Sequence, residues 1–263
     1  MNYSNLRKYG NSPFRVCLVH GGPGVAGGMT PVAHELADNT GILEPFQTAD
    51  SIHGQIEELQ DVLESEGDPP IIVIGFSWGA WLSYILAALY PDLVRKLILV
   101  SSGPFEEKYA KNIQETRMGR LNEKEKQEAE SLMRKIGDPK VDHKNKLFER
   151  FGALISQADT YEFIPAESEK LEYRCDIFQK IWPEADALRK SGKLLNLGNN
   201  IQCPVVAIHG DFDPHPAKGV QKPLSRILKD FRFILLEKCG HKPWIEKYAN
   251  ERFFQLLHDE IIG

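Results

Sequence analysis

A five-residue motif, Gly75–Gly79 (GFSWG), lies between two apolar segments and limits the folds that the chain can adopt. The preceding residues, Ile71–Ile74, form a short β-branched run without a polar side chain, which is typical of a strand buried on both faces of a parallel sheet. The following residues, Trp81–Tyr90, predict a buried helix that ends at Pro91. A strand, a tight turn and a helix in this order indicate a layered α/β fold with right-handed βαβ connections.

Further strand-like runs occur on both sides of this unit. Phe14–Val19 leads into a glycine-rich loop, and Leu97–Val100 provides the next buried strand. Two more strands are expected at Pro204–His209 and Phe231–Leu236, and the amphipathic segment Ile245–Ile262 predicts a closing helix. Together these elements predict a fold of the α/β class whose sheet is mostly parallel and doubly wound.

The middle of the chain differs in composition from both ends. Between Pro104 and Leu197 we find no convincing strand, and charged helices are expected at Asn122–Ile136 and Lys144–Gln157. A further helix is expected at Pro183–Lys190, because proline is favoured in the first turn of a helix. We therefore expect a helical insertion. The predicted parts are a first core part at residues 1–103, a helical cap at 104–197 and a second core part at 198–263.

The composition excludes several classes of protein. With 42% hydrophobic and 26% charged residues, the chain has the make-up of a globular protein and not of a disordered, collagenous or coiled-coil one. A net charge of −5 argues against nucleic acid as the main partner, and no apolar run approaches the ~20 residues that span a bilayer. The first ten residues carry no signal peptide, so we expect a cytoplasmic protein without a membrane partner.

The cysteines give no sign of a metal or redox site. None of them forms a CxxC pair, and in a cytoplasmic protein free thiols are expected. The sequence suggests neither a metal nor an organic cofactor. The four cysteines are Cys17, Cys175, Cys203 and Cys239.

The GFSWG motif has the form G-x-S-x-G, in which the serine occupies a sharp turn between a strand and a helix. Such a turn pushes the Ser77 hydroxyl out over the edge of the sheet, and the two glycines leave room for the strained backbone of the serine. The helix N-terminus behind it favours negative charge that develops there. We therefore predict that Ser77 is a nucleophile. The alternative is a plain turn whose serine caps the helix.

A serine hydroxyl needs a base, and His241 is our candidate because it lies in the loop after the last predicted strand. Loops that follow parallel strands gather at the carboxyl edge of the sheet, where Ser77 is also expected. His20, His209 and His215 also follow strands and compete for this role. His20 and His209 directly abut apolar runs, which favours structural roles for both.

An acid that orients the imidazole is expected in the loop after Pro204–His209. Asp211 and Asp213 both lie in this loop, and we favour Asp213. The chain order Ser77, Asp213, His241 is the order typical of hydrolases with this serine motif. The carboxylate that is not used would cap the loop or face solvent.

Acyl transfer also needs N–H donors for the oxyanion of the tetrahedral intermediate. The amide of Trp78 follows the nucleophile, and a second amide is expected from Gly22 in the first glycine-rich loop. That loop has the sequence HGGPG at residues 20–24. It fits neither G-x-x-x-x-G-K-[ST] nor G-x-G-x-x-G, so a nucleotide site is not indicated.

Four motifs can now be taken together: HGGPG at 20–24, GFSWG at 75–79, GDFD at 210–213 and GH at 240–241. The set resembles α/β-hydrolases of the proline iminopeptidase type, in which a tryptophan typically follows the serine. The resemblance covers roughly residues 14–103 and 198–263. It implies an α/β-hydrolase fold with a helical cap. It also implies Ser77 as nucleophile, Asp213 as acid, His241 as base, and the amides of Gly22 and Trp78 as oxyanion donors.

Two features depart from that family. Its members usually carry an Asp-Gln-Arg-Gly stretch after the next strand, whereas residues 41–50 here are GILEPFQTAD. Little sequence precedes Phe14, so the two leading antiparallel strands common in the superfamily are expected to be missing or reduced. Neither departure touches Ser77, Asp213 or His241, but both bear on the peptidase specificity.

The motifs and the resemblance predict a serine hydrolase that cleaves a small amide or ester, or a short peptide, through a covalent acyl-enzyme. An aminopeptidase of the proline iminopeptidase type is the first choice. A carboxylesterase or amidase for small acyl compounds is the main alternative, and a non-catalytic binding protein on the same scaffold is another. Haloalkane or epoxide chemistry would need an aspartate where Ser77 stands.

The predicted cap contributes further candidates. In aminopeptidases of this type, cap carboxylates hold the free amine of the substrate. The acidic candidates here are Glu162, Glu167, Glu169 and Glu172, for which a solvated acidic helix face is the alternative. The aromatic candidates for lining the pocket are Phe105, Phe178 and Trp182, for which packing within the cap is the alternative.

Overall fold

The computed structural model describes residues 5–38, 40–165 and 171–263, and this part of the chain contains a central sheet of seven strands. The strands lie in the order β1-β4-β2-β5-β6-β8-β9. β1 is antiparallel to β4, and every other neighbouring pair is parallel, which confirms the predicted α/β class. The strands are β1 (Leu6–Tyr9), β2 (Phe14–Val19), β4 (Gly41–Pro45), β5 (Ile71–Phe76), β6 (Val94–Val100), β8 (Val205–Gly210) and β9 (Phe231–Leu236).

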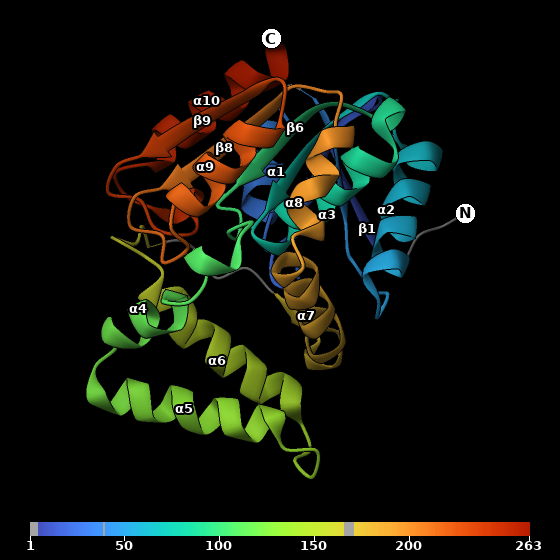
Figure 1. Cartoon of the computed structure of the whole chain (residues 1–263). Helices are drawn as coiled ribbons and strands as arrows, with labels where there is room; N and C mark the ends of the chain where they lie inside the picture. The colour runs from blue at the N-terminus through green and yellow to red at the C-terminus, as the bar shows by residue number, and fades with distance from the viewer. Residues whose placement is uncertain (1–4, 39, 166–170) are drawn as a thin grey trace.

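Helices cover both faces of this sheet (Figure 1). Alternate residues of each strand point into opposite cores: Ile71 and Val73 pack with α2 and α3, and Ile72 and Ile74 pack with α1 and α10. Because both faces of β5 are buried, the strand contains no polar side chain. The helices of these layers are α1 (Thr30–Leu36), α2 (Ile52–Glu66), α3 (Trp78–Leu89), α9 (Lys218–Ile227) and α10 (Asn250–Ile262).

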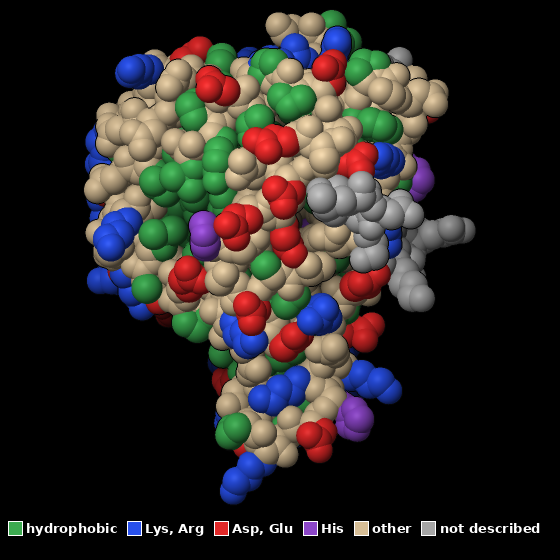
Figure 2. Space-filling model, turned by 90° about the vertical axis from the view of Figure 1, so that its right-hand side faces the viewer, with side chains coloured by type: hydrophobic (Ala, Val, Ile, Leu, Met, Phe, Trp, Pro, Cys, Tyr) green, Lys and Arg blue, Asp and Glu red, His purple; other side chains and the backbone are tan. Residues whose placement is uncertain are grey.

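The helices between β6 and β8 extend beyond the two layers. α4, α5 and α6 lie together below the sheet in Figure 1, and Figure 2 shows this part as a narrower projection from the body. α5 begins with a capping box, in which Asn122 Oδ1 accepts from the amide of Glu125 at 3.0 Å and the Glu125 carboxylate accepts from the amide of Asn122 at 3.1 Å. We call α4 to α7, with their joining loops, the α4–α7 segment. Its helices are α4 (Ile113–Gly119), α5 (Glu123–Gly137), α6 (Lys144–Ala158) and α7 (Cys175–Lys190), and the short α8 (Lys193–Asn196) follows.

Two short strands depart from the sequence-based expectations. One of the two leading strands that were expected to be missing or reduced is present: Leu6–Tyr9 forms β1 on the edge of the sheet. Its residues, LRKY, are mostly half-buried and show no clear apolar alternation, so no local pattern indicates a strand there. In the stretch where no strand was expected, β7 (Glu172–Tyr173) pairs antiparallel with β3 (Val25–Ala26). Two residues are too few to produce a periodic pattern.

Helix α7 also differs from the prediction, since it begins at Cys175 and contains Pro183 in its interior. An internal proline removes one backbone hydrogen bond of the helix. The buried residues Ile177, Ile181 and Ala185 share one face of α7 and pack into the core with α2 and α3. This burial outweighs the lost hydrogen bond. Within the part of the chain that the structure describes, no helix is long and apolar enough to cross a membrane.

Candidate active site

Ser77 occupies the turn between β5 and α3 in a strained backbone conformation. Its φ and ψ angles are 53° and −112°, a region that residues with a side chain rarely adopt. A Cβ atom on Gly75 would lie 2.3 Å from the carbonyl oxygen of Gly79, and one on Gly79 would lie 2.2 Å from that of Val19. Gly75 therefore allows α3 to lie close against β5, and Gly79 allows it to lie close against β2, which fixes the position of Ser77.

The structure brings Ser77, His241 and Asp213 together. Ser77 Oγ lies 3.1 Å from His241 Nε2, and His241 Nδ1 lies 2.7 Å from Asp213 Oδ2. Asp211, the other carboxylate considered, instead accepts a hydrogen bond from the amide of Cys239 at 3.1 Å and so caps this loop. The three side chains form a continuous hydrogen-bonded chain that can carry a proton from the serine to the imidazole.

The carboxylate of Asp213 is fully buried and accepts three hydrogen bonds. His215 donates through its backbone amide at 2.9 Å and its Nδ1 at 2.8 Å, and His241 donates through Nδ1 at 2.7 Å. Burial alone would raise the pKa of Asp213, but the neighbouring histidines and the hydrogen bond from His215 hold this pKa well below its usual range. Asp213 therefore stays ionised and holds the proton of His241 on Nδ1, which leaves Nε2 free to accept a proton.

His215, which the sequence offered only as a competing base, supports Asp213 instead. Its Nε2 lies 3.5 Å from an Arg117 nitrogen, and its ring centre lies 4.6 Å from that of His241. Burial lowers the pKa of His215 to about 4, so the ring is neutral at physiological pH. The ligand atoms of Asp213, His215 and His241 lie within 4.8 Å of one another, but a metal there would have to replace the hydrogen bonds that join them.

The other two buried histidines have structural partners. His20 Nδ1 donates to the carbonyl of Gly21 at 2.9 Å, and its Nε2 accepts from the amide of Gln47 at 3.3 Å. His209 Nε2 donates to the carbonyl of His215 at 2.7 Å. Burial lowers the pKa of His20 to about 4 and also lowers that of His209. Both rings therefore hold loops in place as neutral side chains.

Two amide groups beside Ser77 remain available. Among the described residues, the backbone N–H groups of Trp78 and Gly22 donate to no protein acceptor. The Trp78 ring is held by a hydrogen bond from its Nε1 to Gln55 Oε1 at 3.1 Å, and Gly22 has the positive φ of 45° that suits glycine. Both residues line the same cavity as Ser77, so both N–H groups are free to bind an oxygen atom there.

A cavity of about 490 Å³ opens in front of Ser77 and His241 and reaches helices of the α4–α7 segment. Two of its aromatic residues were predicted to line it: Trp182 stacks on Trp81 with ring centres 6.4 Å apart, and Phe178 stacks on Trp182 at 6.2 Å. Phe105 is instead fully buried and packs against Trp81 from outside the cavity. Most of the lining is apolar, including Val25, Phe76, Trp78, Trp81, Ile113, Met133, Phe148, Phe151, Ile155, Leu171, Phe178 and Trp182.

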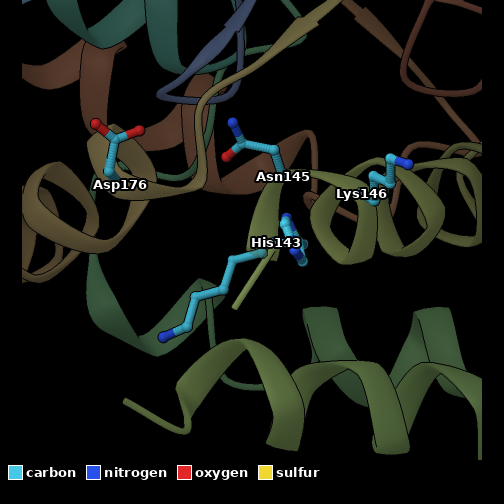
Figure 3. Close-up of a pocket in the computed structure, with 5 residues that line it drawn as sticks. His143, Asn145, Lys146 and Asp176 are labelled. Atoms are coloured by element: carbon cyan, nitrogen blue, oxygen red, sulfur yellow. The ribbon is translucent and has the colours of Figure 1, made fainter. Parts of the chain in front are cut away.

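A second hollow, of about 460 Å³, lies at the start of α6 and is open to solvent (Figure 3). It is lined by His143, Lys144, Asn145, Lys146 and Asp176. Asn145 Oδ1 already accepts a hydrogen bond from a backbone amide at 2.9 Å, and the Asp176 carboxylate pairs with an arginine at 2.8 Å. None of these residues lines the cavity at Ser77, and the hollow holds no nucleophile with a base, so we assign it no chemistry.

The carboxylates that line the cavity at Ser77 are already paired. Asp159 accepts two hydrogen bonds from Arg117 Nε, at 2.8 and 3.1 Å, and one from its Nη2 at 2.6 Å. Asp186 forms an ion pair with Arg189, whose guanidinium lies over the Trp81 ring. Among the described lining residues, no carboxylate is therefore left to bind a substrate cation.

The acidic residues proposed from the sequence lie away from this cavity where the structure describes them. Glu162 pairs with Lys247, and Glu172 is exposed on β7. Neither lines the cavity. Glu167 and Glu169 lie outside the described residues.

The loop that carries His241 is tied to the loop that follows α6. The amide of His241 donates to the carbonyl of Asp159 at 2.9 Å. The buried Glu246 carboxylate accepts from the amide of Gly240 at 2.8 Å and from the amides of residues 161 and 162, each at 2.9 Å. Burial raises the pKa of Glu246 despite these three hydrogen bonds. The position of His241 thus depends on contacts with the α4–α7 segment.

The family model for the alpha/beta hydrolase fold matches residues 5–248 of the chain. The chain belongs to this family. The fold expected from the motif resemblance is thereby confirmed.

Relatives of this α/β hydrolase include pimeloyl-[acyl-carrier protein] methyl ester esterases of Neisseria meningitidis. The serogroup A protein is 23% identical over 211 residues, which make up 79% of this chain and 62% of that protein. The match to the serogroup C protein is also 23% identical and covers 76% of its length. The chain thus spans less than two thirds of the first relative.

Solved structures of other proteins share the fold of this α/β hydrolase. The crystal structure of VinJ has a TM-score of 0.70 at 18% identity and covers 97% of this chain and 93% of VinJ. A putative lipase from Acinetobacter baumannii AYE has a TM-score of 0.67 at 18% identity, and the match covers 100% of this chain and 89% of that chain.

The relatives from Neisseria are named esterases. Their names do not support the proline iminopeptidase subtype that the motif resemblance implied.

Proposed function

We propose that this hydrolase cleaves carboxylic esters of small apolar acyl groups through a covalent acyl-enzyme on Ser77. The observation that carries the proposal is the hydrogen-bonded chain from Ser77 through His241 to Asp213, which opens onto an apolar cavity of about 490 Å³. A cavity of this size and lining takes a small, largely apolar molecule. The names of the Neisseria relatives also favour an ester over an amide.

The proposed reaction follows from the positions of the donors and acceptors. As Ser77 Oγ attacks the ester carbonyl, His241 Nε2 takes the proton from this hydroxyl. The amides of Trp78 and Gly22 donate to the oxyanion of the tetrahedral intermediate. When the intermediate collapses, His241 gives its proton to the leaving alcohol. A water molecule, deprotonated by His241, then attacks the acyl-enzyme and releases the acid.

Recognition of a free amine distinguishes an aminopeptidase from an esterase in this proposal. An ammonium group in an apolar cavity needs a carboxylate partner, because burying an unpaired charge is costly. The described carboxylates of the cavity, Asp159 and Asp186, already pair with Arg117 and Arg189. This pairing supports the esterase and weakens the aminopeptidase, which was the first choice from the sequence.

A turnover panel with the native protein and its Ser77→Ala variant tests the proposal. The panel holds acetyl and butyryl aryl esters beside Pro-, Ala- and Leu-arylamides and their N-blocked forms. We expect ester cleavage that falls by at least about 10⁴-fold in Ser77→Ala, because the nucleophile is lost. Circular dichroism and thermal melting would check that the variant is folded.

Three outcomes of this panel would contradict the esterase. Ser77-dependent cleavage of arylamides only when their amine is free would show an aminopeptidase. Full ester turnover in Ser77→Ala would show that the reaction does not pass through this serine. Silence of the native protein on every substrate would favour a binding protein over an esterase for these acyl groups.

A further inference from the structure

Lys242 directly follows His241 in the chain and lines the same cavity as Ser77. Its Nζ donates to Ser156 Oγ on α6 at 3.2 Å. Among residues 5–38, 40–165 and 171–263, this ammonium forms no ion pair with a carboxylate. A lysine ammonium has three N–H donors, so two of them remain for another acceptor.

The charged groups that interact with Asp159 carry an excess of positive charge, and Lys242 is one of them. The charge of Asp159 acts on Lys242, but Arg117 already holds this carboxylate through three hydrogen bonds. Arg120 adds another cation, which donates to two backbone carbonyls at 3.1 and 2.8 Å. Even with Asp213 counted, these three cations outnumber the two carboxylates.

A half-buried ammonium that has only a hydroxyl partner is poorly compensated for the water it has lost. Burial accordingly lowers the pKa of Lys242. An anion placed against its two unused N–H groups would form charge-assisted hydrogen bonds in a water-poor site, where such bonds are strong. The Ser156 hydroxyl lies at hydrogen-bond distance from the same Nζ and can donate to that anion.

We propose that Lys242 and Ser156 form a subsite for an oxyanion, a carboxylate or a phosphate-type group, carried by the leaving alcohol of the substrate. The inference rests on the proposed function. His241 protonates the leaving oxygen, so the alcohol lies on the His241 side of Ser77. Lys242 follows His241 in the chain and lines the same cavity, so the proposed subsite lies on this side as well. The aromatic lining around Trp81 and Trp182 then receives the apolar acyl group.

Three matched esters test the subsite: 4-carboxyphenyl, 4-phosphonophenyl and 4-carbamoylphenyl butyrate. They share the acyl group, and only the first two carry an anion on the leaving phenol. The quantity measured is the ratio of kcat/KM for each anionic ester to kcat/KM for the neutral carbamoyl ester. Comparing this ratio between variants cancels the intrinsic reactivity of each phenol.

The variants are Lys242→Met, Lys242→Arg and, as a matched control, Lys247→Met. Lys247 lies on the same loop, but its ammonium is exposed and pairs with Glu162. We expect Lys242→Met to lower the ratio for at least one anionic ester by about tenfold. Lys242→Arg and Lys247→Met should retain it. The ester with the larger loss shows whether the subsite takes a carboxylate or a phosphate-type anion. An unchanged ratio in Lys242→Met would overturn the proposal.

A binding measurement separates this inference from the proposed function. In the Ser77→Ala background the esters are bound and not cleaved, so calorimetric titration gives their Kd directly. We expect Lys242→Met in this background to raise the Kd of an anionic ester about tenfold relative to the carbamoyl ester. Ser77-dependent ester turnover with no effect of Lys242 would refute only the subsite. Lys242-dependent binding without turnover in the native protein would refute the esterase and leave the anion subsite standing.

Discussion

Replacing Asp213 and Asp211 separately by asparagine compares two carboxylates that lie two residues apart. Asp213 contacts His241 Nδ1 at 2.7 Å, whereas Asp211 accepts only from the amide of Cys239 among its described contacts. Each substitution keeps the size of the side chain and removes one negative charge. The pair therefore separates the effect of an acid on the histidine from a general effect on this loop.

The expected loss follows from the hydrogen bonds of Asp213. Both bonds from His215 end on Oδ1, and the bond from His241 ends on Oδ2. If the oxygen of the new asparagine keeps the two bonds from His215, its NH₂ group faces His241 Nδ1. Nδ1 must then be unprotonated, the proton moves to Nε2, and His241 cannot take the proton of Ser77. Loss of the correct tautomer costs about 10⁴-fold in kcat, or about 5.5 kcal/mol of transition-state stabilisation.

Asp211→Asn leaves an oxygen that can still accept from the Cys239 amide, so we expect less than about a threefold change in kcat. The assay is kcat for an aryl butyrate, with thermal melting to show that both variants are folded. More than a tenth of the native activity in Asp213→Asn, or a larger loss in Asp211→Asn, would refute the assignment of Asp213.

Two further predictions concern stability. Burial lowers the pKa of His20 and His215 to about 4 from 6.5, so the unfolded chain binds more protons between these pH values. The free energy of unfolding should therefore fall as the pH drops from 6.5 toward 4, by up to about 1.4 kcal/mol per pH unit for each histidine. Urea unfolding at pH 7 and pH 5 measures this, and a His20→Gln variant with the same pH dependence would contradict it. Gly79→Ala should cost about 3 kcal/mol, because its Cβ would lie 2.2 Å from a carbonyl oxygen, whereas Gly119→Ala has nothing within 4 Å and should be nearly neutral. Equal melting temperatures for the two variants would show that this clash is relieved.

The proximity of Ser77, Asp213 and His241 could be predicted because it follows from the connectivity of a parallel sheet. Each residue lies in a loop after a strand, and the carboxyl ends of β5, β8 and β9 meet at one edge. The strands themselves are recognisable because burial on both faces requires continuous apolar runs. Because the topology places these strand ends together, the local sequence pattern predicts that residues far apart in the chain lie close in space.

Other features of the site depend on packing that no local pattern encodes. Asp159 reaches the cavity because α6 ends there, and its partner Arg117 comes from α4. The roles of His215 and Lys242 depend on the side chains that surround them in the fold. No local pattern shows these neighbours, even though His215 lies two residues after Asp213 and Lys242 directly follows His241. Strand β1 was not predicted for a different reason. A short edge strand that is only half-buried does not need a run of apolar residues, so its sequence carries no strand pattern.

The hydrogen bonds around Glu246 limit how freely the helices of the α4–α7 segment could be exchanged for those of another protein. Four amides, from residues 161, 162, 240 and 241, end on Glu246 or on the carbonyl of Asp159. Grafting a foreign set of helices onto this core would remove residues 159–162 and leave the loop of His241 without its outer support. A chimaera would therefore have to carry residues 159–162 together with Glu246. Natural variation in the helices is expected to stop short of this junction.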